Sequence, residues 1–282
     1  IVKLLVRKYM RSNEQKNLCL AGGVHMNCKL NGELSKLGEV KNIFIQPASS
    51  DNGVSLGAAI ILAKKYEAKK FTKLENVYYG PEFSNKQILD SIKEAKLSFR
   101  KSNNIFFETA KYLSNGKIVG WFQGRSEVGA RALGNRSILA NPMIGNMRYK
   151  LNKEVKHREL WRPFCPSVND THFKEYFKDC SDSPYMILAL PVKDYYRKKF
   201  DSSVHIDGTA RPQVVTKKSN IKYWKLIDQF GKITGHPILI NTSFNIQGEP
   251  IVNTPSNAIR CFFGTGIDIL VLNNFIITKK NY

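Results

Sequence analysis

The first part of the chain alternates short apolar runs with stretches of helical periodicity. Apolar runs at 17–20 and 42–46 predict two short strands, and helical patterns surround them at 1–12, 24–37 and 54–66. This order predicts an α-β-α-β-α segment at the end of an α/β domain. Such a short segment cannot bury both faces of a sheet alone. We therefore expect the chain, which begins with isoleucine, to be a fragment or processed product whose structural partner precedes its first residue.

The rest of the chain predicts a second domain of the α/β or α+β class. Helices are predicted at 86–95, 104–115, 220–234 and 255–263, and strands at 118–122, 185–190, 237–240 and 267–272. A stretch with little periodicity contains Gly80-Pro81 and predicts a linker between the two parts. The predicted organisation is an incomplete first domain at 1–72, a linker at 73–85 and a second domain at 86–282.

The composition is that of a soluble globular protein with an unusual charge. The 282 residues are 42% hydrophobic and 24% charged, and the formal net charge is +21. Such a charge indicates anionic partners, among them phosphates, nucleotides, nucleic acid or a membrane surface, or it reflects genomic composition bias. We favour composition bias together with small anionic substrates, and nucleic acid is the less favoured partner.

Cysteine usage and hydropathy indicate the compartment. The five cysteines form no C-x-x-C pair, which argues against a disulfide framework and a cysteine-based zinc site and favours a reducing compartment. No run of about 18 apolar residues occurs, so no transmembrane helix is expected. The start of the chain does not have the pattern of a signal peptide, because lysine and arginine interrupt its apolar run. We expect a cytoplasmic protein without membrane contact.

The densest chemical motif is the glycine- and arginine-rich segment 120–137, which follows a predicted strand. It contains Arg125, Arg131 and Arg136 among several glycines. Glycines let a loop approach a ligand closely, and the arginine fork binds phosphate or carboxylate through two N–H groups. The segment therefore favours anion binding. The alternative is a surface loop whose arginines pair with Glu127 or other acids.

A second basic cluster is predicted on a helix. Positions 153, 156 and 157 have the spacing of one helical face, and Lys156 is followed by Arg158 and Arg162. Taken alone, this cluster is typical of a solvated helix end more often than of a site. Arg211 adds one more cation beside a turn proline.

Small polar residues follow an apolar strand near the C-terminus. The strand leads directly into Asn241, Thr242, Ser243 and Asn245. Hydrogen-bonding side chains at the carboxyl end of a strand are typical of ligand crevices in α/β sheets. A capped turn explains the same residues equally well.

The first domain has its own candidate residues. Gly22 and Gly23 lie between a predicted strand and a helix, where backbone N–H groups can bind an anion, although tight packing explains a lone Gly-Gly equally well. Asp51 precedes another helix, where it can serve as an N-cap or hold a metal ion. The five histidines show no H-x-x-x-H spacing, and none is assigned as a ligand.

Six segments, in this order, resemble the NodU/CmcH-type O-carbamoyltransferase family over nearly the whole chain. The segments are LAGGVHMNCKLNGEL, QPASSDNGVSLGAA, GWFQGRSEVGARALGNRSILANP, NKEVKHRELWRPFCPSV, TARPQ and LINTSFNIQGEPIV. The resemblance implies the end of an actin-like, ATPase-type domain followed by a YrdC-like α/β domain with a mixed twisted sheet. It also implies two steps. Carbamoyl phosphate and ATP first give carbamoyl-adenylate and pyrophosphate, and the carbamoyl group is then transferred to a hydroxyl.

The resemblance assigns roles to individual residues. Lys156-His157-Arg158 and Ser243-Phe244-Asn245 look like the family's K-x-R and S-x-N signatures, with Lys156, Arg162 and Ser243 as catalytic residues. The implied contacts of carbamoyl phosphate or adenylate are Arg125, Arg131, Arg136, Lys156, Arg158, Arg162, Arg211, Asn241, Ser243 and Asn245. In the actin-like part, the implied nucleotide contacts are Gly22, Gly23 and Asn27, and Asp51 looks like a metal ligand.

The implied cofactors are ATP with Mg²⁺, and Fe(II) or another divalent metal at the transfer site. The family's H-x-x-x-H ligands would lie in the missing N-terminal half of the actin-like domain, so a complete transfer site cannot form from this chain. Ala130 stands where the family often has proline, which frees the backbone of this loop. The alternatives are a tRNA threonylcarbamoyl-type enzyme and a non-catalytic nucleotide-binding remnant. The acceptor cannot be read from the sequence.

Overall fold

The computed structural model describes residues 1–12, 14, 16–66, 74–178 and 182–279. Its first part has the predicted α-β-α-β-α order, with helices α1 (Val2–Arg11), α2 (Cys28–Ser35) and α3 (Val54–Lys65) and strands β1 (Asn17–Leu20) and β2 (Asn42–Ile45). The two strands pair in parallel, in register from Asn17 opposite Asn42 to Leu20 opposite Ile45. The predicted boundary at residue 72, the start of the linker and Cys180 lie outside the described residues.

The helix predicted at 24–37 is divided into two pieces. A 3₁₀ turn, η1 (Gly23–Met26), precedes α2, and Asn27 separates them with ψ 95°. The Oδ1 atom of Asn27 accepts hydrogen bonds from the backbone N–H groups of Lys29 and Leu30, both at 3.1 Å. Asn27 is therefore an N-cap, a role that ends one helical element and begins the next.

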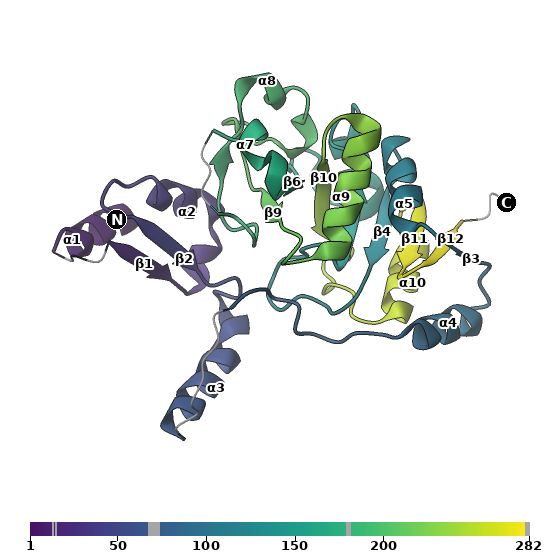
Figure 1. Cartoon of the computed structure of the whole chain (residues 1–282), viewed down its shortest axis with the longest axis horizontal. Coiled ribbons are helices and arrows are strands. Elements are labelled where there is room, and N and C mark those ends of the chain that lie inside the picture. Colours follow the sequence, from purple (N-terminus) through teal and green to yellow (C-terminus); the bar gives the residue numbers. More distant parts are fainter. Residues whose placement is uncertain (13, 15, 67–73, 179–181, 280–282) are drawn as a thin grey trace.

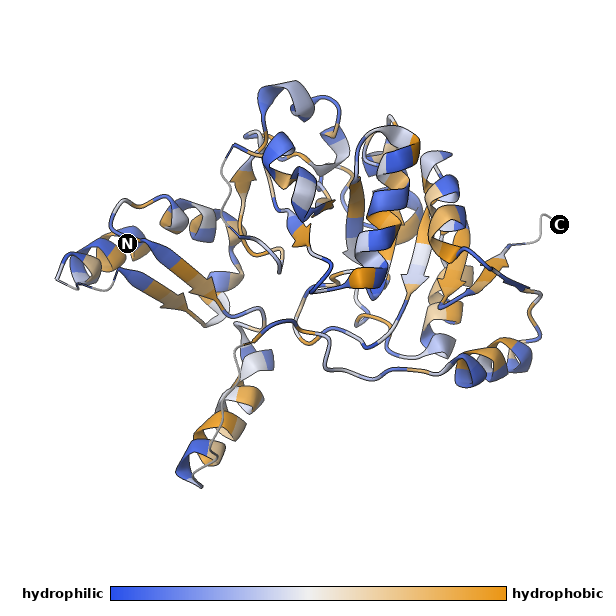
Figure 2. Cartoon of the chain, viewed as in Figure 1, coloured by the Kyte–Doolittle hydropathy of each residue, from blue (hydrophilic) through white to orange (hydrophobic). Residues whose placement is uncertain are grey.

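Helix α3 projects away from the rest of the molecule (Figure 1). A short 3₁₀ turn, η2 (Asp51–Gly53), leads into it. Much of the helix is apolar (Figure 2), and Val54, Ile61 and Leu62 are each more than half exposed. An amphipathic helix normally buries its apolar side chains against another element. The chain thus presents an apolar surface that none of its described residues covers.

The second part is built on an eight-stranded mixed sheet, which confirms the predicted mixed α/β class. The strand order is β3-β12-β11-β4-β5-β10-β6-β9, with parallel pairing only in β11–β4 and β6–β9. The strands are β3 (Arg100–Lys101), β4 (Val119–Phe122), β5 (Arg136–Ala140), β6 (Cys165–Asn169), β9 (Gln213–Val215), β10 (Ile238–Ser243), β11 (Ile269–Leu272) and β12 (Phe275–Thr278).

Helices cover both faces of this sheet (Figure 1). Helices α5 (Ile105–Ser114) and α9 (Ile221–Thr234) pack on one face, and α4 (Asn85–Glu94) and α10 (Pro255–Phe263) contribute to the core on the other. Strand β4 shows the alternation that such layers require. Trp121 faces α5 and α9, whereas Phe122 belongs to the opposite core.

Smaller elements complete the second part. They are α6 (Met147–Lys150), the π-helix η3 (Leu151–Lys156), η4 (Asp170–His172), α7 (Phe173–Tyr176), α8 (Asp194–Arg197), η5 (Asp201–Ser203), and strands β7 (Leu190–Pro191) and β8 (Thr209–Ala210). The strand predicted at 185–190 is wrong except at its last residue. Its apolar side chains are buried in a loop, and Met186 has a left-handed backbone with φ 55°.

The two parts share a hydrophobic core. Leu20, Leu34 and Ile45 of the first part cluster with buried residues of the second, including Leu188 and Val214. Helix α2 docks closely on the loop before β7, where the backbone N–H of Ala189 donates to the Cys28 carbonyl at 3.0 Å. A Cβ on Gly32 would lie 2.2 Å from the Ala189 carbonyl oxygen, so this contact requires glycine.

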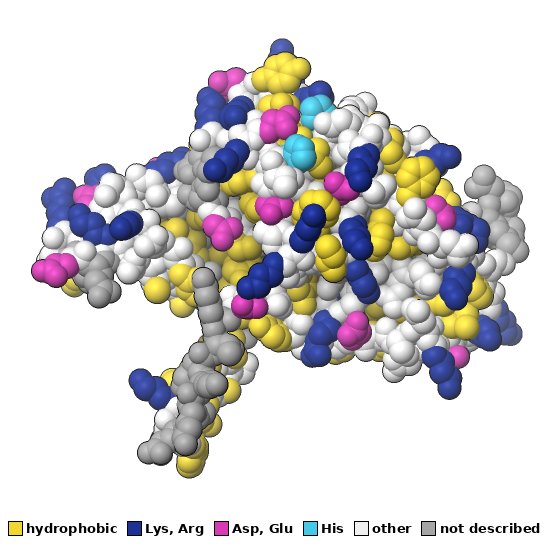
Figure 3. Space-filling view, viewed as in Figure 1, with side chains coloured by type: hydrophobic (Ala, Val, Ile, Leu, Met, Phe, Trp, Pro, Cys, Tyr) yellow, Lys and Arg dark blue, Asp and Glu magenta, His cyan; other side chains and the backbone are white. Residues whose placement is uncertain are grey.

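The segment before α4 packs on the second part. Residues 74–84 form no helix or strand, as predicted, but Val77 is buried beside Leu133 and Met186. The Tyr78 hydroxyl donates to the Leu133 carbonyl at 2.8 Å. No helix in the described ranges is both long and apolar enough to span a membrane. Lysine and arginine side chains are scattered over the face that Figure 3 presents.

Candidate functional site

The carboxyl end of β10 lies at the centre of the candidate site. The strand is hydrogen-bonded between β5 and β6, and Ser243 is its last residue, opposite Ser137. Asn241 is buried, and the chain turns after Ser243 toward Asn245. The small polar side chains lie at the carboxyl end of this strand, and their role in ligand binding stays a prediction.

Lys156 reaches this strand end from the π-helix η3. Its Nζ donates to the Ser243 carbonyl at 2.8 Å and Oγ at 3.2 Å, and to the Asn245 carbonyl at 2.9 Å and Oδ1 at 2.7 Å. The Ser243 hydroxyl donates to Asn245 Oδ1 at 2.6 Å. The two signatures noted in the sequence therefore meet in space, although they lie nearly ninety positions apart.

The predicted helical face at 153, 156 and 157 is wrong. The helix widens to a π-turn and ends at His157, which has a left-handed backbone with φ 46°. Lys153 is exposed, whereas only 5% of Lys156 is accessible. The interpretation of this cluster as a solvated helix end therefore fails for Lys156, because a wider turn directs its side chain inward.

Burial favours the neutral form of the Lys156 side chain. Its removal from water, reinforced by the nearby Arg158 guanidinium, lowers its pKa from 10.5 to about 7. The oxygens around Nζ act in the opposite direction, because an ammonium donates three hydrogen bonds. The group consequently changes charge near neutral pH.

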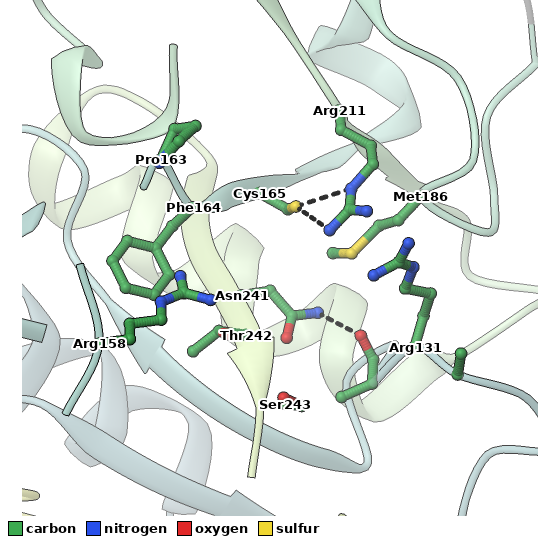
Figure 4. Close-up of a pocket in the computed structure, with 12 residues that line it drawn as sticks. Arg131, Arg158, Pro163, Phe164, Cys165, Met186, Arg211, Asn241, Thr242 and Ser243 are labelled. Atoms are coloured by element: carbon green, nitrogen blue, oxygen red, sulfur yellow. Dashed lines mark hydrogen bonds between the residues drawn. The ribbon is translucent and has the colours of Figure 1, made fainter. Parts of the chain in front are cut away.

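Three arginines surround a small cavity of about 120 Å³ beside this strand end. Figure 4 shows Arg131, Arg158 and Arg211 around the space above Asn241 and Ser243. None of the residues that line the cavity is acidic, and its wall consists of Ala130, Arg131, Ala132, Arg158, Pro163, Phe164, Cys165, Met186, Arg211, Asn241, Thr242 and Ser243. Three neighbouring cations without a carboxylate among them have the chemistry to bind a small anion.

Contacts with neighbouring side chains hold two of the three arginines in place. Arg158 Nε donates to Asn152 Oδ1 at 2.7 Å, and its guanidinium lies 4.8 Å from the centre of the Phe164 ring. Arg211 donates from Nε and Nη2 to Cys165 Sγ at 3.0 and 2.9 Å. These contacts fix the direction of the charged ends, so an arriving anion need not order them.

Of the three arginines in the cavity, Arg131 is the one whose hydrogen bonds are least satisfied. Burial, together with the charge of Arg211, lowers the pKa of Arg131 to about 10, so it stays protonated at neutral pH. Its Nε is buried and meets no acceptor among the described residues. A buried donor without a partner is costly, and an anion in the cavity would satisfy it.

The other three predicted arginines lie outside this cavity. Arg136 is fully buried, and its guanidinium donates to the carbonyls of Gln123, Gly124, Asn135 and Pro81 at 2.7–3.1 Å. Backbone oxygens occupy its two terminal nitrogens, whereas its buried Nε has no partner among the described residues, and its contact with carbamoyl phosphate stays a prediction. Arg125 is exposed and donates to the Tyr79 carbonyl, and exposed Arg162 pairs with Glu159.

Glu127 has a role that the sequence did not indicate. Its Oε1 accepts hydrogen bonds from the backbone N–H groups of Leu133, Asn135 and Arg136 at 2.7–3.3 Å. Burial raises the pKa of Glu127. No ion pair joins it to an arginine of the loop in the part of the chain that the structure describes, so the alternative of surface Arg–Glu pairs is wrong. Glu127 shapes the loop that presents Arg131.

A second hollow of about 360 Å³ adjoins the cavity. Ala130 and Ser243 line both spaces, and Asn245, Glu249 and Asn52 border the second one. Arg136 also borders it. Because Asn52 belongs to the first part of the chain, this hollow lies where the two parts meet. It provides room for a larger ligand beside the small anion site.

The predicted residues of the first part do not converge on the cavity. Gly22 and Gly23 are exposed at the start of η1, and a Cβ on either would meet no atom within 4 Å. Asp51 is the first residue of η2 and makes no side-chain cap, so its predicted role as an N-cap is wrong. No group of three or more potential metal-ligating side chains occurs among the described residues.

Comparison with known proteins identifies the family. The family model of the carbamoyltransferase C-terminus matches residues 110–279, and that of the carbamoyltransferase N-terminus matches residues 1–60. The chain belongs to the carbamoyltransferase family. This result confirms the resemblance that the six sequence segments indicated. The longer match covers every strand of the sheet except β3, together with Lys156 and all the arginines of the cavity.

Nodulation proteins are among the relatives of this carbamoyltransferase chain. It is 40% identical to nodulation protein NolO of Bradyrhizobium diazoefficiens, over 99% of this chain and 52% of that protein. It is 38% identical to NolNO of Sinorhizobium fredii, over 99% and 42%, and 34% identical to nodulation protein U of Rhizobium tropici, over 94% and 44%. The chain thus spans about half the length of these relatives.

Solved structures resemble the carbamoyltransferase chain over part of its length. Full-length HypF in its phosphate- and nucleotide-bound form aligns with a TM-score of 0.43 and 16% identity, over 65% of this chain and 23% of that one. P. abyssi Sua5 complexed with L-threonine aligns with a TM-score of 0.42 and 14% identity, over 62% and 48%.

Proposed function

We propose that this chain carries out the activation step of an O-carbamoyltransferase. Carbamoyl phosphate, ATP and water would give carbamoyl-adenylate, pyrophosphate and phosphate. The observation that carries this proposal is the convergence of Arg131, Arg158 and Arg211 on one small cavity beside Ser243. Membership of the carbamoyltransferase family supplies the carbamoyl group as the chemical class.

The chemistry requires anions to approach one another. Water splits carbamoyl phosphate into carbamate and phosphate, and a carbamate oxygen then attacks the α-phosphorus of ATP. The new carbamate–phosphorus bond replaces the bond to pyrophosphate, which leaves. Fixed cations favour both steps because they offset the charge repulsion and stabilise the charge that develops on the phosphorus oxygens.

The residues of the site divide between binding and positioning. The three arginines of the cavity would hold carbamoyl phosphate and then carbamate. Lys156 would fix Ser243 and Asn245 at the boundary with the second hollow, where ATP would place its α-phosphate. Arg162 would act from its exposed position near Trp161, after moving away from Glu159. Mg²⁺ would enter bound to the phosphates of ATP.

Transfer to the hydroxyl acceptor would need more than this chain. Asp51 is the one metal-ligand candidate that the resemblance assigns, and no cluster of ligands accompanies it among the described residues. The chain does not fit a complete Fe(II) site, and we derive no step through such a metal. We propose that the remaining part of an actin-like domain, as the longer relatives would supply, covers the apolar surface of α3.

One observation favours a second candidate function, a tRNA threonylcarbamoyl-type modification. The net charge of +21 suits a polyanionic partner. The scatter of Lys and Arg over the visible face gives this candidate less support than a single basic stripe would (Figure 3). Binding of tRNA that weakens steeply with salt would favour it, whereas binding of ATP without pyrophosphate release would indicate a nucleotide-binding remnant.

Pyrophosphate release tests the activation step. The purified chain is incubated with ATP, Mg²⁺ and fresh carbamoyl phosphate, and release that depends on carbamoyl phosphate is the expected result. The variants Arg131→Ala, Lys156→Ala and Ser243→Ala should lose it, whereas Lys153→Ala removes an exposed lysine of the same helix and should keep it. Equal release from all four variants would refute the assignment of the site.

A further inference from the structure

Asn241 is held in the cavity wall by its amide nitrogen. Only 1% of the residue is exposed, and Nδ2 donates to the Ala132 carbonyl at 3.3 Å, Ser167 Oγ at 3.1 Å and Gln213 Oε1 at 3.0 Å. Its Oδ1 is buried and has no hydrogen-bond partner among the described residues. A buried acceptor that lacks a donor raises the free energy of the folded protein. A ligand that donates a hydrogen bond to this oxygen would remove that cost.

Neighbouring groups fix which end of the amide faces the cavity. Gln213 donates from Nε2 to the Leu133 carbonyl at 2.7 Å, which leaves its Oε1 to accept from Asn241 and from the Ser167 hydroxyl. Rotating the Asn241 amide by half a turn would bring Oδ1 against two acceptors, Gln213 Oε1 and the Ala132 carbonyl. The network therefore keeps Oδ1 free to meet a ligand.

The cavity otherwise offers mainly donors. Figure 4 shows the Asn241 amide between Arg158 and Arg131, with its oxygen directed away from the hydrogen bond that its nitrogen makes. Guanidinium groups donate hydrogen bonds and cannot accept them. The phosphoryl group of an ester or acyl phosphate, as its dianion, would satisfy these arginines but carries no hydrogen for Asn241 Oδ1. The ligand that completes the cavity therefore carries acceptor oxygens together with an N–H or O–H group.

We propose that Asn241 determines specificity by accepting a hydrogen bond from the amide N–H of the carbamoyl group. This inference rests on the proposed function, and it explains how the same site would distinguish carbamoyl phosphate from other acyl phosphates. A carbamoyl group has the hydrogen that Oδ1 lacks, whereas an acyl phosphate of the same shape, with a methyl group in that place, leaves Oδ1 buried and unpaired. Asn241 thus rejects acyl phosphates that the arginines alone would accept.

Two stable phosphonates separate these contributions. Phosphonoacetamide and 2-oxopropylphosphonate have the same phosphonate and carbonyl groups. They differ only in the group on the carbonyl carbon, which is NH₂ in the first compound and methyl in the second. Titration calorimetry on the wild-type chain should show about tenfold weaker binding of the methyl compound, since one buried hydrogen bond is lost. Equal affinities would overturn the role of Asn241. Failure of both compounds to bind would overturn the proposed anion site itself.

Variants assign the selectivity to one side chain. Asn241→Leu should bind the two phosphonates with equal affinity, because no acceptor remains to favour the amide. Arg131→Ala should weaken both by a similar factor and keep their ratio, since it removes charge and leaves Oδ1 in place. An unchanged ratio in Asn241→Leu would refute the assignment. If that variant does not fold, the comparison of the two ligands on the wild-type chain still decides the proposal.

Discussion

Replacing Lys156 by methionine tests how burial controls the charge at the end of β10. Methionine has a similar length but no charge and no donor, and the site is only 5% exposed. In the wild-type chain, burial lowers the pKa of Lys156 from 10.5 to about 7. Unfolding therefore takes up a proton between about pH 7 and pH 10, and raising the pH across that window stabilises the wild-type fold.

The size of the effect follows from the shift. Each pH unit within the window contributes about 1.4 kcal/mol to the free energy of unfolding when one proton separates the two states. Between about pH 7.5 and pH 9.5, the wild type should therefore gain about 2.5 kcal/mol relative to Lys156→Met. Groups that titrate alike in both proteins cancel in this difference. Below about pH 6 the difference should stop changing, because Lys156 is then protonated in both states.

Urea unfolding at several pH values measures this difference. Lys153→Met is the matched control, because Lys153 is exposed on the same helix, and its difference from the wild type should not depend on pH. A constant difference for Lys156→Met across the whole range would refute the reasoning. It would mean that the four oxygen contacts of Nζ keep Lys156 charged despite its burial.

Three further predictions follow from other parts of the structure. Arg131→Ala should weaken the binding of inorganic phosphate at least about tenfold by calorimetry, whereas Lys101→Ala on the edge strand should not; equal effects would mean that the overall positive charge alone attracts the anion. Gly32→Ala should lower the free energy of unfolding by about 1–3 kcal/mol, because its Cβ meets a carbonyl, and Gly38→Ala, in open space, should have little effect in the same urea titration. Ile61→Glu should reduce the concentration-dependent self-association of the chain, measured by light scattering. An unchanged profile would mean that the chains do not associate through α3.

The sequence predicted much of the fold because the spacing of apolar residues along the chain differs between helices and strands. The boundaries of α9, β10 and α10 were predicted to within a few residues, since an apolar pattern of the right period reports which face is buried. The prediction failed at 185–190, where the apolar side chains are buried in a loop. An apolar run indicates burial, and it does not state whether the backbone is extended.

The candidate site was predicted unevenly. The K-x-R and S-x-N segments were expected to act together, and the structure joins Lys156 to Ser243. Arg131 and Arg136 have similar sequence surroundings, yet one lines the cavity and the other binds backbone carbonyls in the core. Glu127 gave no signal, because its partners are backbone N–H groups, which every residue but proline carries.

The sequence by itself determined the family, the order of the helices and strands, and the residue types available for binding an anion. Only the tertiary structure decided which of these charges are buried, which are paired and which face a shared cavity. The physical reason is that the free energy of a charged or polar side chain depends on its distance from water and from partners far along the chain. Asn241 shows this most clearly, because the acceptor that it keeps free is selected by Gln213 and Ala132, which lie on other segments of the chain.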